Sequence, residues 1–109
     1  MNGMEIEDFG RWAVAWAEEH GGLWSVQENL VRLAEEVGEV ARHVNAQGGR
    51  KQLPPGTESA AGEIGDVLFV LALLAHQLDT GLGAAAREAL RKQERRGERK
   101  EDGRIRDEG

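Results

Sequence analysis

The chain of 109 residues contains no cysteine, no tyrosine and only two prolines. Without cysteine it can form neither a disulfide nor a thiolate metal site or nucleophile. The longest unbroken apolar run covers residues 67–75, whereas a membrane helix needs about 20 residues. The N-terminal residues also lack the basic and apolar pattern of a secretory signal. We therefore expect a cytoplasmic protein with one small domain and no membrane contact.

Basic residues are outnumbered, since 14 lysines and arginines stand against 20 aspartates and glutamates and give a net charge of −6. The acidic excess lies in the first 86 residues. Only residues 87–109 carry a basic excess. Nucleic acid needs a basic surface, so this acidic body disfavours binding to it. The carboxylates need another explanation, which is either a bound divalent metal or plain solvated helix faces.

Apolar periodicity predicts four helices with short links and no strand. They are expected at residues 5–19, 26–47, 57–79 and 84–96. Ser25 and Glu28 form a capping box at the second start, and Thr57 is the expected N-cap of the third helix. The fold class is therefore all-α and like a four-helix bundle, with a domain over residues 1–97 and a charged, disordered tail over 98–109.

The third predicted helix is apolar on every side rather than along one stripe. Val70, Leu71, Leu73 and Leu74 point in different directions around it. A helix of this kind is buried all round. Three short partner helices leave one side of it uncovered, so we expect a homo-oligomer.

Five carboxylates recur at helical spacing on the second and third helices. They are Glu35, Glu36, Glu39, Glu63 and Asp66. Residues three or four apart share a helix face, so these like charges would repel each other unless a cation lies between them. Oxygen ligands suit hard cations, chiefly Mg²⁺, with Mn²⁺ as an alternative. Gly38, Gly62 and Gly65 lie beside the acids and suggest close approach of a backbone or a ligand.

The segment Glu35-Glu36-Val37-Gly38-Glu39, followed by Glu63-Ile64-Gly65-Asp66, resembles the EExxE…ExxD signature of the MazG-like all-α nucleotide pyrophosphohydrolases. The similarity extends over about residues 10–96. It implies Mg²⁺-dependent hydrolysis of a nucleoside triphosphate to the monophosphate and pyrophosphate, as in nucleotide-pool house-cleaning. The oligomer expected from the apolar third helix would be a homodimer or homotetramer.

The resemblance further implies roles for the five acids. Glu36, Glu39, Glu63 and Asp66 would be the metal ligands, and Glu35 would orient or deprotonate the attacking water. Such a site would act chiefly by positioning the water and neutralising phosphate charge.

The resemblance also points to substrate contacts. Lys92, Arg95 and Arg96 lie where the family places cations for the triphosphate, although Arg91 stands near the place of an expected asparagine. Arg50 and Lys51 are a second possible source of phosphate contacts. For the base, Asn29 matches a nucleotide-contacting position, and Trp24 in a glycine-flanked loop is the stacking candidate. Trp12 and Trp16 are expected in the core, because they lie on the apolar stripe.

Three other functions compete with this interpretation. The first is phosphoribosyl-ATP pyrophosphatase, a related enzyme whose site is built from carboxylates in the same way. A non-catalytic helical oligomer could use the acidic faces to bind a basic partner. A di-iron carboxylate bundle needs Glu-x-x-His on two helices, and the chain has no such motif.

Overall fold

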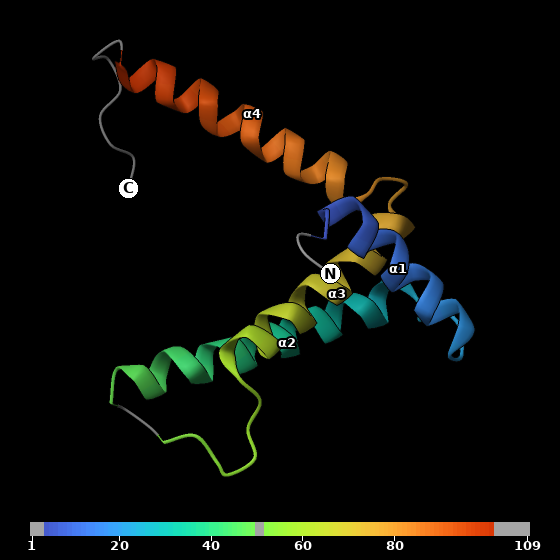
Figure 1. Cartoon of the computed structure of the whole chain (residues 1–109), viewed down its shortest axis with the longest axis vertical. Helices are drawn as coiled ribbons and strands as arrows, with labels where there is room; N and C mark the ends of the chain where they lie inside the picture. The colour runs from blue at the N-terminus through green and yellow to red at the C-terminus, as the bar shows by residue number, and fades with distance from the viewer. Residues whose placement is uncertain (1–3, 50–51, 102–109) are drawn as a thin grey trace.

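The computed structural model describes residues 4–49 and 52–101, and within these ranges the chain is helical with no strand. The helices are α1 (Ile6–Glu19), α2 (Val26–Gln47), α3 (Ala60–Gln77) and α4 (Leu82–Glu101). Figure 1 shows α2 and α3 lying side by side and antiparallel, with α1 crossing the far end of α3. The predicted all-α class and the four helices are confirmed.

The starts of α2 and α3 are set by serine caps. The Ser25 hydroxyl accepts a hydrogen bond from Glu28 N (3.1 Å), and Ser25 N donates to Glu28 Oε1 (3.0 Å), which confirms the capping box. At α3 the expected Thr57 cap is wrong. Ser59 caps this helix by accepting from Gly62 N at 3.1 Å. The Thr57 hydroxyl instead donates to the Pro54 carbonyl at 2.6 Å, closing a turn before the helix.

The small core lies where α1 packs on the C-terminal half of α3. Ala13 and Ala17 of α1 contact Ala72 and Leu73 of α3, and Leu82 at the start of α4 closes the cluster. Alanines at the contact allow α1 to approach α3 closely. This core anchors the end of α3 away from Glu63.

Trp12 and Trp16 do not lie in that core, contrary to the expectation from the apolar stripe. Their exposed fractions are 50% and 42%, respectively. Both rings pack edge-on against Phe69, with centroid distances of 6.2 and 5.9 Å. The apolar stripe of α1 predicted that both tryptophans are buried. Within one chain, however, the only aromatic ring of α3 that packs against them is Phe69.

The apolar helix α3 is covered on only part of its surface. Val70, Leu73 and Leu74 are buried, whereas Leu71 remains 37% exposed and Leu78 66% exposed. By length and mean hydropathy α3 matches a membrane span, but the core helix of a soluble protein has the same properties. Its acidic N-terminal half and its packing on α1 and α2 fit that second explanation.

Helix α4 projects away from the other three (Figure 1). It contacts α1 and α3 but not α2. It continues to Glu101, past the predicted end at residue 96 and into the segment expected to be a disordered tail; residues 102–109 lie outside those described. The radius of gyration, 17.2 Å, exceeds the value of about 13 Å expected for a compact domain of this length.

Candidate metal centre and base-binding hollow

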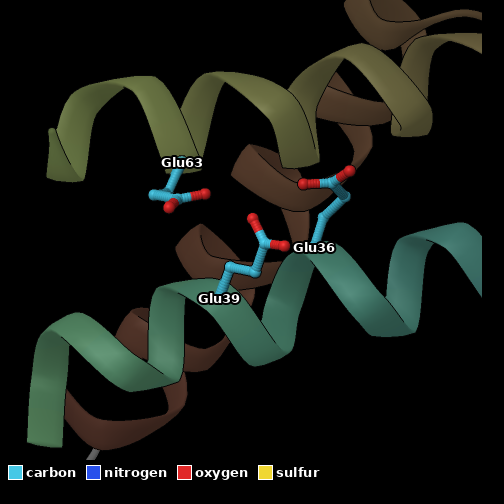
Figure 2. A group of neighbouring side chains, drawn as sticks. All are labelled: Glu36, Glu39 and Glu63. Carbon is cyan, nitrogen blue, oxygen red and sulfur yellow. The ribbon is translucent and has the colours of Figure 1, made fainter. Parts of the chain in front are cut away.

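Carboxylates from α2 and α3 converge on the space between the two helices. Glu36 and Glu39 rise from α2 towards Glu63 of α3, as Figure 2 shows. One oxygen from each of these three side chains lies within 4.8 Å of the others. Glu63 also forms a second such group with Asp66 and Glu58. The structure therefore brings together the four acids for which the sequence implied metal ligation.

Glu63 is the buried centre of both groups. Its exposed fraction is 3%, and its Oε1 has no hydrogen-bond partner among the described residues. Burial raises the pKa of this carboxyl, and so do contact with Glu39 and repulsion from Glu58. A buried carboxylate without a partner is costly, so the protein alone leaves Glu63 unsatisfied.

The pKa of the Glu36 carboxyl is also raised. Loss of solvent is the largest cause, followed by repulsion from Asp66 and Glu39. Arg32 acts in the opposite direction, with its Nε 3.9 Å from Glu36 Oε2 one turn earlier on α2. This guanidinium is the basic group that the motif itself lacks.

The spacing of the motif does not point to two further side chains at this centre. Glu58 precedes α3 and falls outside the EExxE…ExxD pattern, so spacing gave no signal for it. His43 lies one turn after Glu39, and its Nε2 is 3.9 Å from Glu63 Oε2. Its position on the acidic face of α2 was the available signal.

Glu35 and the motif glycines lie outside the carboxylate groups. Glu35 is exposed and lines a shallow hollow with Trp24 and Arg32. A Cβ added at Gly38 or Gly65 would meet no atom within 4 Å, so within one chain no backbone approaches them. At Gly62 a Cβ would lie 2.9 Å from Glu58 Oε1, so the close neighbour there is a side chain and not a backbone.

A cavity of about 140 Å³ lies beside the carboxylates, where α1, α2 and α3 meet. Its lining includes Trp16, Trp24, Asn29, Arg32 and Phe69. The Arg32 guanidinium lies over the rings of Trp24 (5.2 Å) and Phe69 (5.5 Å). Flat rings and a guanidinium plane are surfaces on which a nucleobase stacks.

Asn29, the predicted nucleotide contact, is fully buried in this lining. Its Nδ2 donates to Gln77 Oε1 (3.0 Å), and Gln77 Nε2 donates to the Trp24 carbonyl (2.7 Å). Because a backbone carbonyl can only accept, the Gln77 amide is fixed, and it fixes Asn29 in turn. Asn29 Oδ1 is left as a buried acceptor with no partner in the described ranges.

The predicted phosphate cations are not brought to this site within one chain. Lys92, Arg95 and Arg96 line a hollow on α4 together with Glu98, on the helix that projects away from α2. Arg50 and Lys51 lie outside the described residues.

The ligand atoms of this centre fit a hard divalent cation. Each carboxylate group supplies three oxygens close enough to share one ion, and Glu63, which belongs to both groups, has an oxygen with no hydrogen-bond partner among the described residues. Oxygen-only sets favour Mg²⁺ and Mn²⁺ over softer metals.

Comparison with known proteins agrees with this geometry. A family model of the MazG nucleotide pyrophosphohydrolase domain matches residues 25–100. The uncharacterised protein YpjD of Bacillus subtilis (strain 168) is 46% identical over 66 residues, which cover 59% of this chain and 60% of YpjD.

Two crystal structures also resemble the fold. The first is YpjD from Bacillus subtilis, described as a candidate pyrophosphatase, with a TM-score of 0.70 and 34% identity over 84% of this chain and 97% of that one. The second is the Bacillus-conserved MazG protein, a nucleotide pyrophosphohydrolase, with a TM-score of 0.69 and 31% identity over 84% and 92% of the two chains. The chain therefore belongs to the MazG nucleotide pyrophosphohydrolase domain family.

Proposed function

We propose that the protein hydrolyses a nucleoside triphosphate to the monophosphate and pyrophosphate in the presence of Mg²⁺. The observation that carries this proposal is the buried Glu63 carboxylate, which has an unpartnered oxygen and belongs to both groups of converging acids. Structural carboxylates are rarely buried without a partner, whereas metal ligands need free oxygens. Membership of the family supports the same conclusion.

Glu36, Glu39, Glu63 and Asp66 would hold the ion. When bound, Mg²⁺ supplies the positive charge that the triphosphate oxygens require. Before it binds, loss of solvent followed by repulsion from Asp66 and Glu39 raises the pKa of Glu36, and burial followed by the effects of Glu39 and Glu58 raises that of Glu63. The space between α2 and α3 is therefore lined by carboxylates whose charge a bound cation would neutralise.

Glu35 would serve the attacking water. It is exposed on the flank of the metal centre, beside Arg32 and Trp24, rather than inside either carboxylate group. A carboxylate in this position can accept a proton from water approaching the α-phosphate of a nucleotide that lies along α2.

The nucleotide would lie along α2 with its base in the 140 Å³ cavity. Asn29, Arg32 and Glu36 follow one another on the same side of the helix, and the first and last are separated by about 10 Å along the axis. That interval leaves room for a sugar and the first phosphate between base and metal. Trp24 would stack on the base, and Asn29 Oδ1 would accept one of its N–H groups.

The triphosphate also needs protein cations, and we propose that a second copy of the chain supplies them. Lys92, Arg95 and Arg96 project on α4 away from their own metal centre, and Leu71 and Leu78 leave an apolar side of α3 uncovered. A homodimer or homotetramer would cover the exposed part of these leucines, and complete burial of one leucine side chain is worth about 1.5–3 kcal/mol. The same contact can carry α4 to a neighbouring site.

A product assay tests the function. The protein is incubated with canonical and modified nucleoside triphosphates and with phosphoribosyl-ATP, with and without Mg²⁺, and the products are separated by chromatography. We expect monophosphate and pyrophosphate from a nucleoside triphosphate in the presence of Mg²⁺. Cleavage of phosphoribosyl-ATP alone would support the related pyrophosphatase activity. No turnover of any of these compounds would contradict the proposal.

A further inference from the structure

The carboxylate face of α2 continues past the motif to a partly buried histidine. His43 lies one turn after Glu39, and its side chain is only 16% exposed. The Nε2 atom is buried and has no hydrogen-bond partner in the part of the chain that the structure describes. Of the three histidines in the sequence, it is the one that reaches the carboxylates.

His43 and Glu63 leave unpartnered atoms at the same place between α2 and α3. The distance from His43 Nε2 to Glu63 Oε2 is 3.9 Å, which is too long for a hydrogen bond. Glu63 Oε1, on the other side of that carboxylate, is also unpartnered. Each unsatisfied buried group destabilises the fold, so a small movement that joined the two residues would be favourable.

The two carboxylate groups do not include His43. Three oxygens from Glu36, Glu39 and Glu63 lie close together, as do three from Glu58, Glu63 and Asp66, and the imidazole stands outside both sets. It lies beside the shared member, Glu63, without belonging to either set. Ligating carboxylates are commonly held in this way by a neighbouring donor, which fixes the oxygen that faces the ion.

We propose that His43 is a positioning residue that donates its Nε2–H to Glu63 Oε2 and so turns Oε1 towards the bound divalent cation. This rests on the metal centre of the proposed function. His43 does not touch the ion or the nucleotide. Its effect is to hold the carboxylate that both acidic groups share, so its loss weakens cation binding more than it alters the fold.

Metal titration of two variants tests this role. Mg²⁺ and Mn²⁺ affinities are measured by calorimetry for the wild type, His43→Leu and His43→Gln. We expect His43→Leu to bind about 10- to 100-fold more weakly, the usual effect of losing a partner of a metal ligand. His43→Gln retains an N–H donor and should restore most of the affinity. The control is His76→Leu, an exposed histidine on α3, which should bind as the wild type does.

A spectroscopic measurement keeps the proposal testable even if His43→Leu does not fold. In the wild-type protein loaded with Mg²⁺, ¹⁵N NMR of the imidazole should show the Nε2–H tautomer, with the signal identified by its absence in His43→Gln. With Mn²⁺, pulsed electron paramagnetic resonance should show no nitrogen coupling, because the imidazole is not a ligand.

Several outcomes would overturn the proposal. An Nδ1–H tautomer with bare Nε2, a nitrogen coupling to Mn²⁺, or unchanged affinity in a folded His43→Leu would each do so. Unchanged affinity in that variant while the wild type binds metal leaves the proposed function standing. A wild type that binds neither ion overturns both.

Discussion

The carboxylates of Glu36 on α2 and Glu63 on α3 approach within 4.8 Å of each other, and the pKa of each is raised by burial and neighbouring acids. Two helices that would otherwise pack favourably are thus forced to bring like charges together. The repulsion is a property of the metal-free chain, so it predicts how stability responds to pH and to cations.

The metal-free protein should be more stable at pH 5 than at pH 8. Because the folded pKa values of Glu36 and Glu63 lie above 4.5, the native state binds more protons than the unfolded state in the window above that value. The free energy of unfolding therefore falls as the pH rises through this window. Thermal melts with a chelator at both pH values measure the difference.

Glu63→Gln should reduce that loss of stability, because the buried group then carries no charge. Glu19→Gln, at the exposed end of α1, is the matched control and should keep the wild-type difference. An identical pH response in Glu63→Gln and the wild type would show that this carboxyl does not cause the effect.

Glu35→Gln and Glu36→Gln should affect different properties, the first the turnover rate and the second Mg²⁺ binding. Glu36 belongs to a carboxylate group and Glu35 does not, so only the first substitution should weaken Mg²⁺ binding, by about tenfold or more. Glu35→Gln should lower the turnover rate by about 100-fold or more with little change in metal affinity. Calorimetric titration beside a rate measurement separates the two. Equal losses of affinity would mean that Glu35 also binds the ion.

Gln77→Leu should damage both stability and nucleotide binding. It removes the acceptor for Asn29 Nδ2 and the donor to the Trp24 carbonyl, so the free energy of unfolding should fall by about 1–3 kcal/mol. The Asn29 amide would then be free to turn, and KM should rise several-fold while Mg²⁺ affinity is kept. Gln47→Leu at the exposed end of α2 is the control. An unchanged KM would remove Asn29 from the base-binding site.

Leu71→Lys should dissociate the oligomer and lower the pyrophosphatase rate. Leu71 is the partly exposed leucine on the middle of α3, whereas Leu73 and Leu74 are buried within the chain and their substitution would unfold it. Size-exclusion chromatography with light scattering gives the mass, and Leu71→Met is the matched apolar control. A wild-type monomer with full activity would refute the oligomer.

The start of α2 and the shared face of its acidic residues were predictable from the sequence because their signals are local. The cap formed by Ser25 and Glu28 needs only three residues of spacing, and Glu36 and Glu39 share a face by helical geometry. Glu63 faces them because α3 returns antiparallel to α2.

The remaining features depend on how the helices meet. Asn29 forms a hydrogen bond with Gln77, which lies 48 positions away in the sequence, and no sequence pattern predicts that pair. The approach of His43 to Glu63 depends on how α2 and α3 pack against each other. The direction of α4 is set by the turn at residues 78–81, where Asp79 adopts a positive φ of 61°. The apolar stripe of α1 predicted buried tryptophans, but one chain does not provide the surface that would cover them.

The most direct test of the metal centre is the rate of pyrophosphate release by Glu39→Gln at saturating Mg²⁺, with its fold checked by circular dichroism. Glu39 lies between Glu36 and Glu63 in the carboxylate group, so the account predicts a folded protein without measurable turnover (Figure 2). Its metal-free melting temperature should be equal to or above that of the wild type, because one repelling charge is gone. Turnover near the wild-type rate would contradict the assignment of the site.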